Sequence, residues 1–95
     1  ATLAEINARL NSLKNQHALY GKAGRAIDGA IEEAQRKDFK DAIKRALKAI
    51  DKLNNIDSDD ARSVQMDIAR AIRVLAMQWT LGTNKDTDMR TEDWP

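Results

Sequence analysis

The 95-residue chain lacks cysteine altogether and has a single proline. Without cysteine it forms no disulfide, holds no zinc through thiolates and carries no catalytic thiol. The proline is Pro95, so none interrupts a helix in the rest of the sequence. No apolar run approaches the roughly 18–20 residues of a membrane span, and we expect a cytoplasmic protein with no membrane contact.

Aromatic residues are also scarce, at 4% of the sequence. An interior built mainly of Ala, Leu and Ile favours closely packed helices over the branched and aromatic faces of a β-sandwich. We therefore predict an all-α fold, a small helical bundle of three or four helices over residues 1–83, followed by a flexible acidic tail over residues 84–95. The net charge of +1 is too even for bulk attraction to nucleic acid or to a membrane.

The N-terminal segment opens with Thr2 and Glu5, the pair that forms a capping box at the start of a helix. Apolar or seam positions then recur three and four residues apart, the spacing of a heptad seam. They are Leu3, Ile6, Leu10, Leu13, His17 and Tyr20, and the register continues through Gly24, Ile27, Ile31 and Ala34. We predict that the first six mediate self-association.

Gly21 and Gly24 are the weak point of this segment, since each glycine costs a helix about 1 kcal/mol relative to alanine. The unbroken register favours one helix over residues 2–36, whereas a break at Gly21–Gly24 gives two. A continuous helix would be about 50 Å long and would outrun its neighbours. Its uncovered seam then predicts a homodimer, while the broken helix predicts a monomeric four-helix bundle.

Two further helices follow. The second, near residues 38–54, is capped by Asp38, and the third, near residues 58–82, by Asp57 or Ser58. The buried stripe of the second comprises Phe39, Ile43, Ala46, Leu47, Ile50 and Leu53. The stripe of the third comprises Ala61, Val64, Ile68, Ile72, Leu75 and Trp79.

Residues 23–54 resemble a tetratricopeptide-type helical hairpin, or the related microtubule-interacting-and-transport bundle. The matching residues are Ala30, Asp38-Phe39 at the turn, Ala42-Ile43 and Ala49-Ile50. Ala26, Gly29 and Glu33 stand where the repeat has bulky side chains, and no second copy follows. The resemblance implies a peptide-binding or scaffold role.

The segment from His17 to Gly24 resembles the phosphoacceptor stretch of histidine phosphotransfer domains. Leu19 and Gly21 occupy the expected positions, but Tyr20 stands where that family has its lysine, and Lys22 lies two residues further on. The resemblance implies phosphorylation of a helix-borne histidine.

Lysines recur every fourth residue along the second helix, at Lys40, Lys44, Lys48 and Lys52. Such a stripe can follow a phosphate backbone, or it can be a solvated helix face. In the tail, Met89 and Trp94 stand among acidic residues, a composition suited to docking on a partner.

With one histidine and no cysteine we expect no metal site and no cofactor, and the carboxylates at residues 57–60 fit helix capping. The sequence thus predicts a non-enzymatic protein–protein interaction or assembly module, a homodimer joined through the N-terminal seam. The alternative is a nucleic-acid-binding protein that uses the lysine stripe, and the third hypothesis is histidine phosphotransfer.

Overall fold

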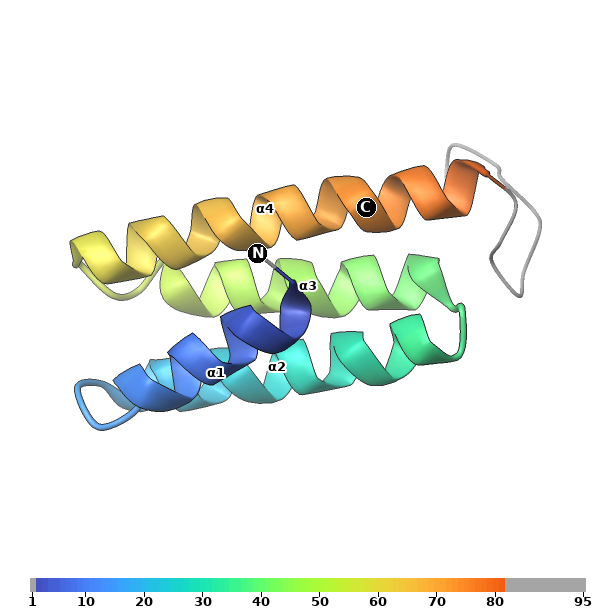
Figure 1. Ribbon diagram of the computed structural model, residues 1–95. Helices are drawn as coiled ribbons and strands as arrows, with labels where there is room; N and C mark the ends of the chain where they lie inside the picture. The colour runs from blue at the N-terminus through green and yellow to red at the C-terminus, as the bar shows by residue number, and fades with distance from the viewer. Residues whose placement is uncertain (1, 82–95) are drawn as a thin grey trace.

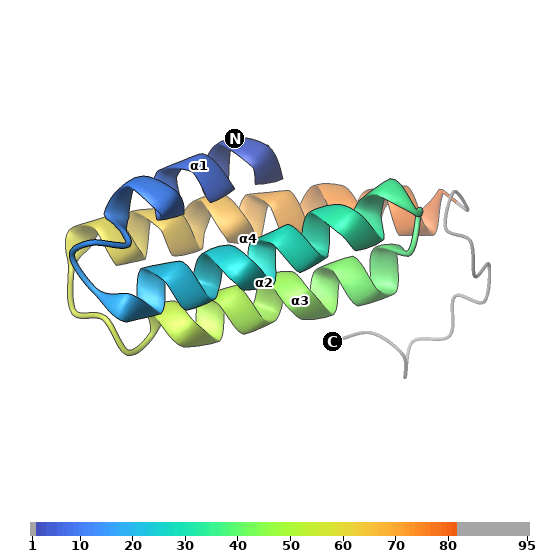
Figure 2. The ribbon, with the colours of Figure 1, turned by 90° about the horizontal axis from the view of Figure 1, so that it is seen from below.

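The structure, a computed structural model, describes residues 2–81. This part of the chain is all-helical, with four helices: α1 (Leu3–Leu13), α2 (Ala18–Gln35), α3 (Phe39–Leu53) and α4 (Asp59–Thr80). α2, α3 and α4 run lengthwise beside one another, and α1 lies along α2 and α4 (Figures 1 and 2). The predicted all-α class and bundle architecture are confirmed. Residues 84–95, expected to form the tail, lie outside the described range.

The N-terminal segment is two helices, so the prediction of one helix over residues 2–36 is wrong. α1 ends at Leu13, residues 14–16 turn, and His17 has an extended backbone with φ −160° and ψ 136°. His17 caps α2, because its ring Nδ1 accepts the amide N–H of Leu19 at 3.0 Å. The predicted break point is wrong as well, since Gly21 and Gly24 both lie within α2.

The starts of the other three helices follow the sequence closely. The Thr2 hydroxyl accepts from the Glu5 amide at 3.2 Å while the Thr2 amide donates to the Glu5 carboxylate at 3.1 Å, completing the capping box. Asp38 caps α3 and Ser58 caps α4, the latter by accepting from the Ala61 amide at 3.1 Å. Each cap satisfies an amide that has no partner within its own helix.

Side chains of α4 hold the end of α3. Arg62 donates to the carbonyl oxygens of Leu53 and Ile56, which lie in and just after the last turn of α3. Gln65 donates to the Ile50 carbonyl at 2.8 Å. The carbonyls of Ile50 and Leu53 also accept the backbone amides of Asn54 and Ile56, so the side chains of α4 add a second donor there and join α4 to the end of α3.

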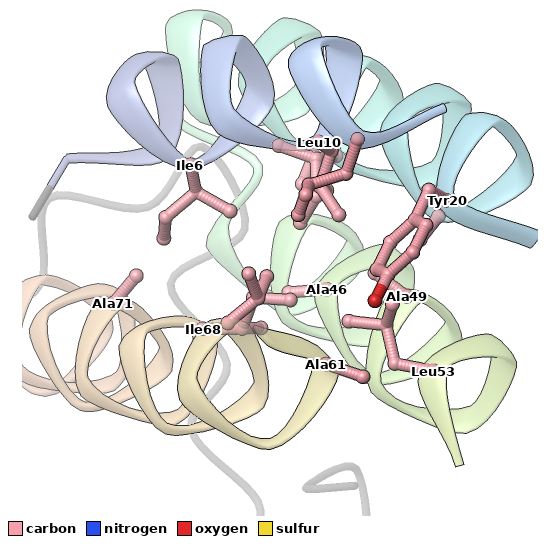
Figure 3. Packing of buried hydrophobic residues seen from close by; sticks show 14 of the residues in the cluster. Ile6, Leu10, Tyr20, Ala46, Ala49, Leu53, Ala61, Ile68 and Ala71 are labelled. Atoms are coloured by element: carbon pink, nitrogen blue, oxygen red, sulfur yellow. The ribbon is translucent and has the colours of Figure 1, made fainter. Parts of the chain in front are cut away.

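The hydrophobic core forms where the buried faces of all four helices meet (Figure 3). Ile6 and Leu10 of α1 point down toward Ile68 of α4, and the Tyr20 ring points toward Ala49 and Leu53 (Figure 3). Six of the 15 buried residues of this cluster are alanines, whose small side chains let the helix backbones approach closely. Of the predicted stripes, Leu47 is the exception, since 37% of it is exposed on the outside of α3.

α1 covers only one end of the bundle. It has 11 residues, about 16 Å of helix, against 22 residues and about 33 Å for α4. Its start lies partway along α2 and α4, and the far end of these helices extends beyond it (Figure 2). A second core cluster, built on Phe39, Ile43, Leu75 and Trp79, fills that far end, where three helices rather than four enclose it.

Candidate functional site

The residues of the N-terminal seam are core residues of the bundle. Ile6, Leu10, Leu13 and Tyr20 are buried, and Leu3 is half-buried at the boundary of the two core clusters. The Tyr20 hydroxyl lies 2.7 Å from the Ser58 hydroxyl, which ties the start of α2 to the start of α4. Ile6, Leu10, Leu13 and Tyr20 therefore pack within one chain and offer little surface to a second copy, whereas Leu3 stays partly exposed. Their role in self-association stays a prediction.

Four of the five large apolar side chains that are exposed among the described residues belong to α4 or its C-cap. Met66, Val74, Met77 and Leu81 are 58%, 55%, 62% and 73% exposed. Val74, Met77 and Leu81 follow one another at spacings of three and four, so they form one continuous patch. Met77 lies on the side of α4 opposite to its buried stripe, whereas Val74 lies at the flank of that stripe, next to Ala71 and Leu75.

The rest of this face is charged. Arg70 and Arg73 stand between Met66 and Met77, and Asp59 and Asp60 occupy the first turn. Arg70 pairs with Asp67 at 3.5 Å, whereas Arg73 forms no ion pair within residues 2–81. α4 is thus acidic at its start, basic in the middle and apolar at its end. We name Met66, Val74, Met77 and Leu81 the outer face of α4.

A cleft opens beside this face, where α1 begins and leaves α2 and α4 uncovered. It is an open groove with a volume of about 430 Å³, and it borders a hollow of about 260 Å³ beside Val74 and Leu75. Most of its lining is apolar, and Lys37 stands among the residues that line it. The principal lining residues are Leu3, Ile31, Ala34, Lys37, Phe39 and Gln78. We name this hollow the end cleft.

The lysine stripe lies on the outside of α3, away from the core. Lys44 and Lys48 are exposed, while Lys40 and Lys52 are half-buried. Lys44 and Lys48 form no ion pair within the described range, although Asp41 and Asp51 belong to the same helix. The structure therefore leaves at least two adjacent positive charges of the stripe open to solvent.

His17 lies in the turn before α2, not on the helix itself. It is exposed, and its Nδ1 is engaged in the cap. A phosphoacceptor of the kind that the resemblance implies stands on a helix, and this position does not meet that condition.

Carboxylates approach one another at the turn between α2 and α3. Oxygen atoms of Glu33, Asp38 and Asp41 lie within 4.8 Å of one another. Asp38 caps α3 by accepting from the Asp41 amide, and Glu33 pairs with Arg36 at 3.3 Å. Helix capping and ion pairing therefore explain the positions of two of these three carboxylates. A further shallow hollow of about 400 Å³ lies between α1 and α2, where Asn7 donates to Asp28 at 2.6 Å.

Sequence reasoning missed the outer face of α4 and the end cleft. The signal for the first is present, since Val74, Met77 and Leu81 repeat at helical spacing beside the buried stripe. The cleft depends on where α1 begins relative to α2 and α4, which no local pattern reveals. Met89 and Trp94, predicted to dock on a partner, lie outside the described residues.

Within residues 2–81, none of the helices is both long and apolar enough to cross a membrane. A comparison with known proteins found no family model, no curated protein and no solved structure that matches the chain.

Proposed function

We propose that the protein is a non-enzymatic assembly module that forms a homodimer through the outer face of α4, in the cytoplasm as the sequence suggests. The observation that supports this is the exposure of four large apolar side chains on one helix face of a small bundle. Apolar patches of this kind are typical of protein interaction sites. The role expected from the sequence is retained, but its surface moves from the N-terminal seam to α4.

Two copies related by a two-fold axis would place Val74, Met77 and Leu81 of one against the same residues of the other. Burying the exposed half of each side chain contributes about 1 kcal/mol, roughly half the value for full burial. Two copies together bury six such side chains. The free energy gained from this burial is similar to the lower end of the estimated cost of association, which is about 4–15 kcal/mol. We therefore expect a weak dimer that dissociates on dilution.

Light scattering over a concentration series tests the proposal. The wild-type mass is expected to rise from that of a monomer to that of a dimer, and Met77→Glu is expected to hold the chain as a monomer. Leu47→Glu is the matched control, because Leu47 is also partly exposed but lies on α3. A wild-type chain that stays monomeric at every concentration would refute the homodimer.

The second candidate is nucleic-acid binding through the lysine stripe, favoured by the exposure of Lys44 and Lys48 without ion pairs. This function predicts binding that weakens steeply with salt and is lost in Lys44→Glu/Lys48→Glu. Fluorescence anisotropy with a labelled duplex and a labelled single strand measures it. The absence of binding at low salt would remove this candidate.

A further inference from the structure

The end cleft lies over part of the second core cluster. Phe39, Ala34 and Leu3 belong to that cluster and also line the cleft. Nearer the other end of the bundle, α1 covers the core with Ile6 and Leu10. Beyond Leu3, where α1 begins, no described helix covers α2 and α4 in the same way. The cleft is therefore the place where an added segment would bury apolar surface at this end of the bundle.

Among the described residues that line the cleft, the one charged side chain is positive. Lys37 lines it with an exposed side chain, and the first turn of α1 presents the positive end of its helix dipole there through Leu3 and Ala4. Glu5 is held by the capping box at the same helix start. An occupant with apolar side chains and surplus negative charge would match this surface.

The sequence beyond Leu81 has this composition. Residues 82–95 contain two large apolar side chains, Met89 and Trp94, and carry four acidic residues against two basic ones. The segment starts four residues after Gln78, which itself lines the cleft, so it leaves α4 about one helical turn away. Met89 and Trp94 follow Leu81 by 8 and 13 residues, which gives them a maximum reach of roughly 26–45 Å.

We propose that the end cleft is a docking site for the chain's own C-terminal segment, residues 82–95, with Trp94 and Met89 as the apolar anchors. The acidic residues around Trp94 face Lys37 and the start of α1. Because the segment is tethered beside the cleft, its effective concentration there is high and a modest intrinsic affinity suffices.

This inference goes beyond the proposed homodimer. Val74 belongs to the outer face of α4 and also lines the hollow beside the cleft, but Met77 and Gln78 each belong to only one of the two surfaces. Gln78 follows Met77 directly, so the two side chains point about 100° apart around the helix. Dimerisation through α4 and occupation of the cleft are therefore separable by mutation.

Paramagnetic labelling of the full chain tests the docking. Because the chain has no cysteine, Thr91→Cys provides one attachment point for a spin label. The variant Met77→Glu is included so that dimerisation does not contribute. We expect amide signals of Ile31, Ala34 and Phe39 to lose intensity, while those of Ala49 and Leu53, at the other end of α3, keep theirs.

Matched variants identify the contacts. Lys37→Glu, at an exposed position in the turn between α2 and α3, is expected to restore the signals around the cleft, and so is Trp94→Ser. Lys48→Glu, the same charge change on the outside of α3, is expected to leave the broadening intact. Circular dichroism checks that each variant remains helical.

Three results would overturn the proposal. The first is the absence of broadening near the cleft, and the second is broadening that Lys37→Glu and Trp94→Ser leave unchanged. The third is broadening that occurs only between separate molecules. It is detected by mixing spin-labelled chains with ¹⁵N-labelled chains that carry no spin label, and it would mean that the segment docks on a second copy. Each result is independent of light scattering on wild type, so failure here and failure of the homodimer are distinguishable.

Discussion

Gly24 of α2 lies directly beneath Leu10 of α1, so that a methyl group on Gly24 would stand 3.8 Å from the Leu10 Cβ. The same methyl group would lie 3.5 Å from the Asn7 side-chain oxygen. Both are ordinary van der Waals distances. The glycine thus sits inside a helix at a close approach between two helices, with room for one carbon and no more.

Alanine in place of Gly21 is expected to stabilise the protein by about 0.5–1 kcal/mol, because the residue lies within α2 and a methyl group there approaches only Lys14, at 3.9 Å. Leucine in place of Gly24 is expected to have the opposite effect and destabilise the protein, because its longer side chain would push α1 away. Urea unfolding measures both. Destabilisation by Gly21→Ala would mean that this glycine terminates a helix after all.

Arg9 joins α1 to α4, and its removal is expected to weaken that contact. Its guanidinium donates to the Ser63 hydroxyl at 3.0 Å and pairs with Asp60 at 3.4 Å and Asp67 at 3.6 Å. Because these side chains are partly exposed, we expect Arg9→Gln to lower the free energy of unfolding by only about 0.5–1 kcal/mol. The loss should shrink in about 1 M salt, where the Debye length is roughly 3 Å.

Arg36→Gln is the control for this experiment. Arg36 is more exposed than Arg9 and pairs only with Glu33 within the described residues, three positions away. Little change is expected at either salt concentration. Equal effects of the two substitutions would show that the bridge between α1 and α4 adds nothing to the fold.

The sequence predicted the features that depend on a few neighbouring residues. Thr2, Asp38 and Ser58 cap their helices because a cap involves only the next three residues. The buried stripe of α4 was predicted for the same reason, since helical spacing alone defines it.

The turn after α1 was not predicted because it leaves the heptad spacing of the apolar residues unchanged. Leu13 and Tyr20 are seven residues apart, which is one heptad, so a turn of four residues between them is invisible in the apolar pattern. His17 fitted the register as a seam residue, yet it caps α2 and is exposed. Whether a seam is covered by the same chain or by another is decided by tertiary packing, which the pattern does not contain.

Glu5 gives the capping box a dependence on pH. Hydrogen bonds from the Thr2 backbone amide and then the Thr2 side chain lower the pKa of Glu5 below its ordinary value of 4.5. A lowered pKa in the folded state means that ionised Glu5 adds stability above the ordinary value and loses it as the pH falls through the folded pKa. Glu5→Gln is expected to flatten this part of the profile, measured as urea midpoints between neutral and acid pH. Identical profiles for both proteins would exclude the contribution.

Leu10→Glu separates a core role of the N-terminal seam from a role in self-association. Leu10 is fully buried between α1, α2 and α4, so a carboxylate there would lose its hydration without gaining a partner. Even truncation of such a leucine to alanine costs about 2–5 kcal/mol. We therefore expect Leu10→Glu to unfold the chain, with loss of helical circular dichroism, whereas Met77→Glu stays folded and loses only association. A Leu10→Glu chain that remains a stable helical monomer would instead return the dimer interface to α1.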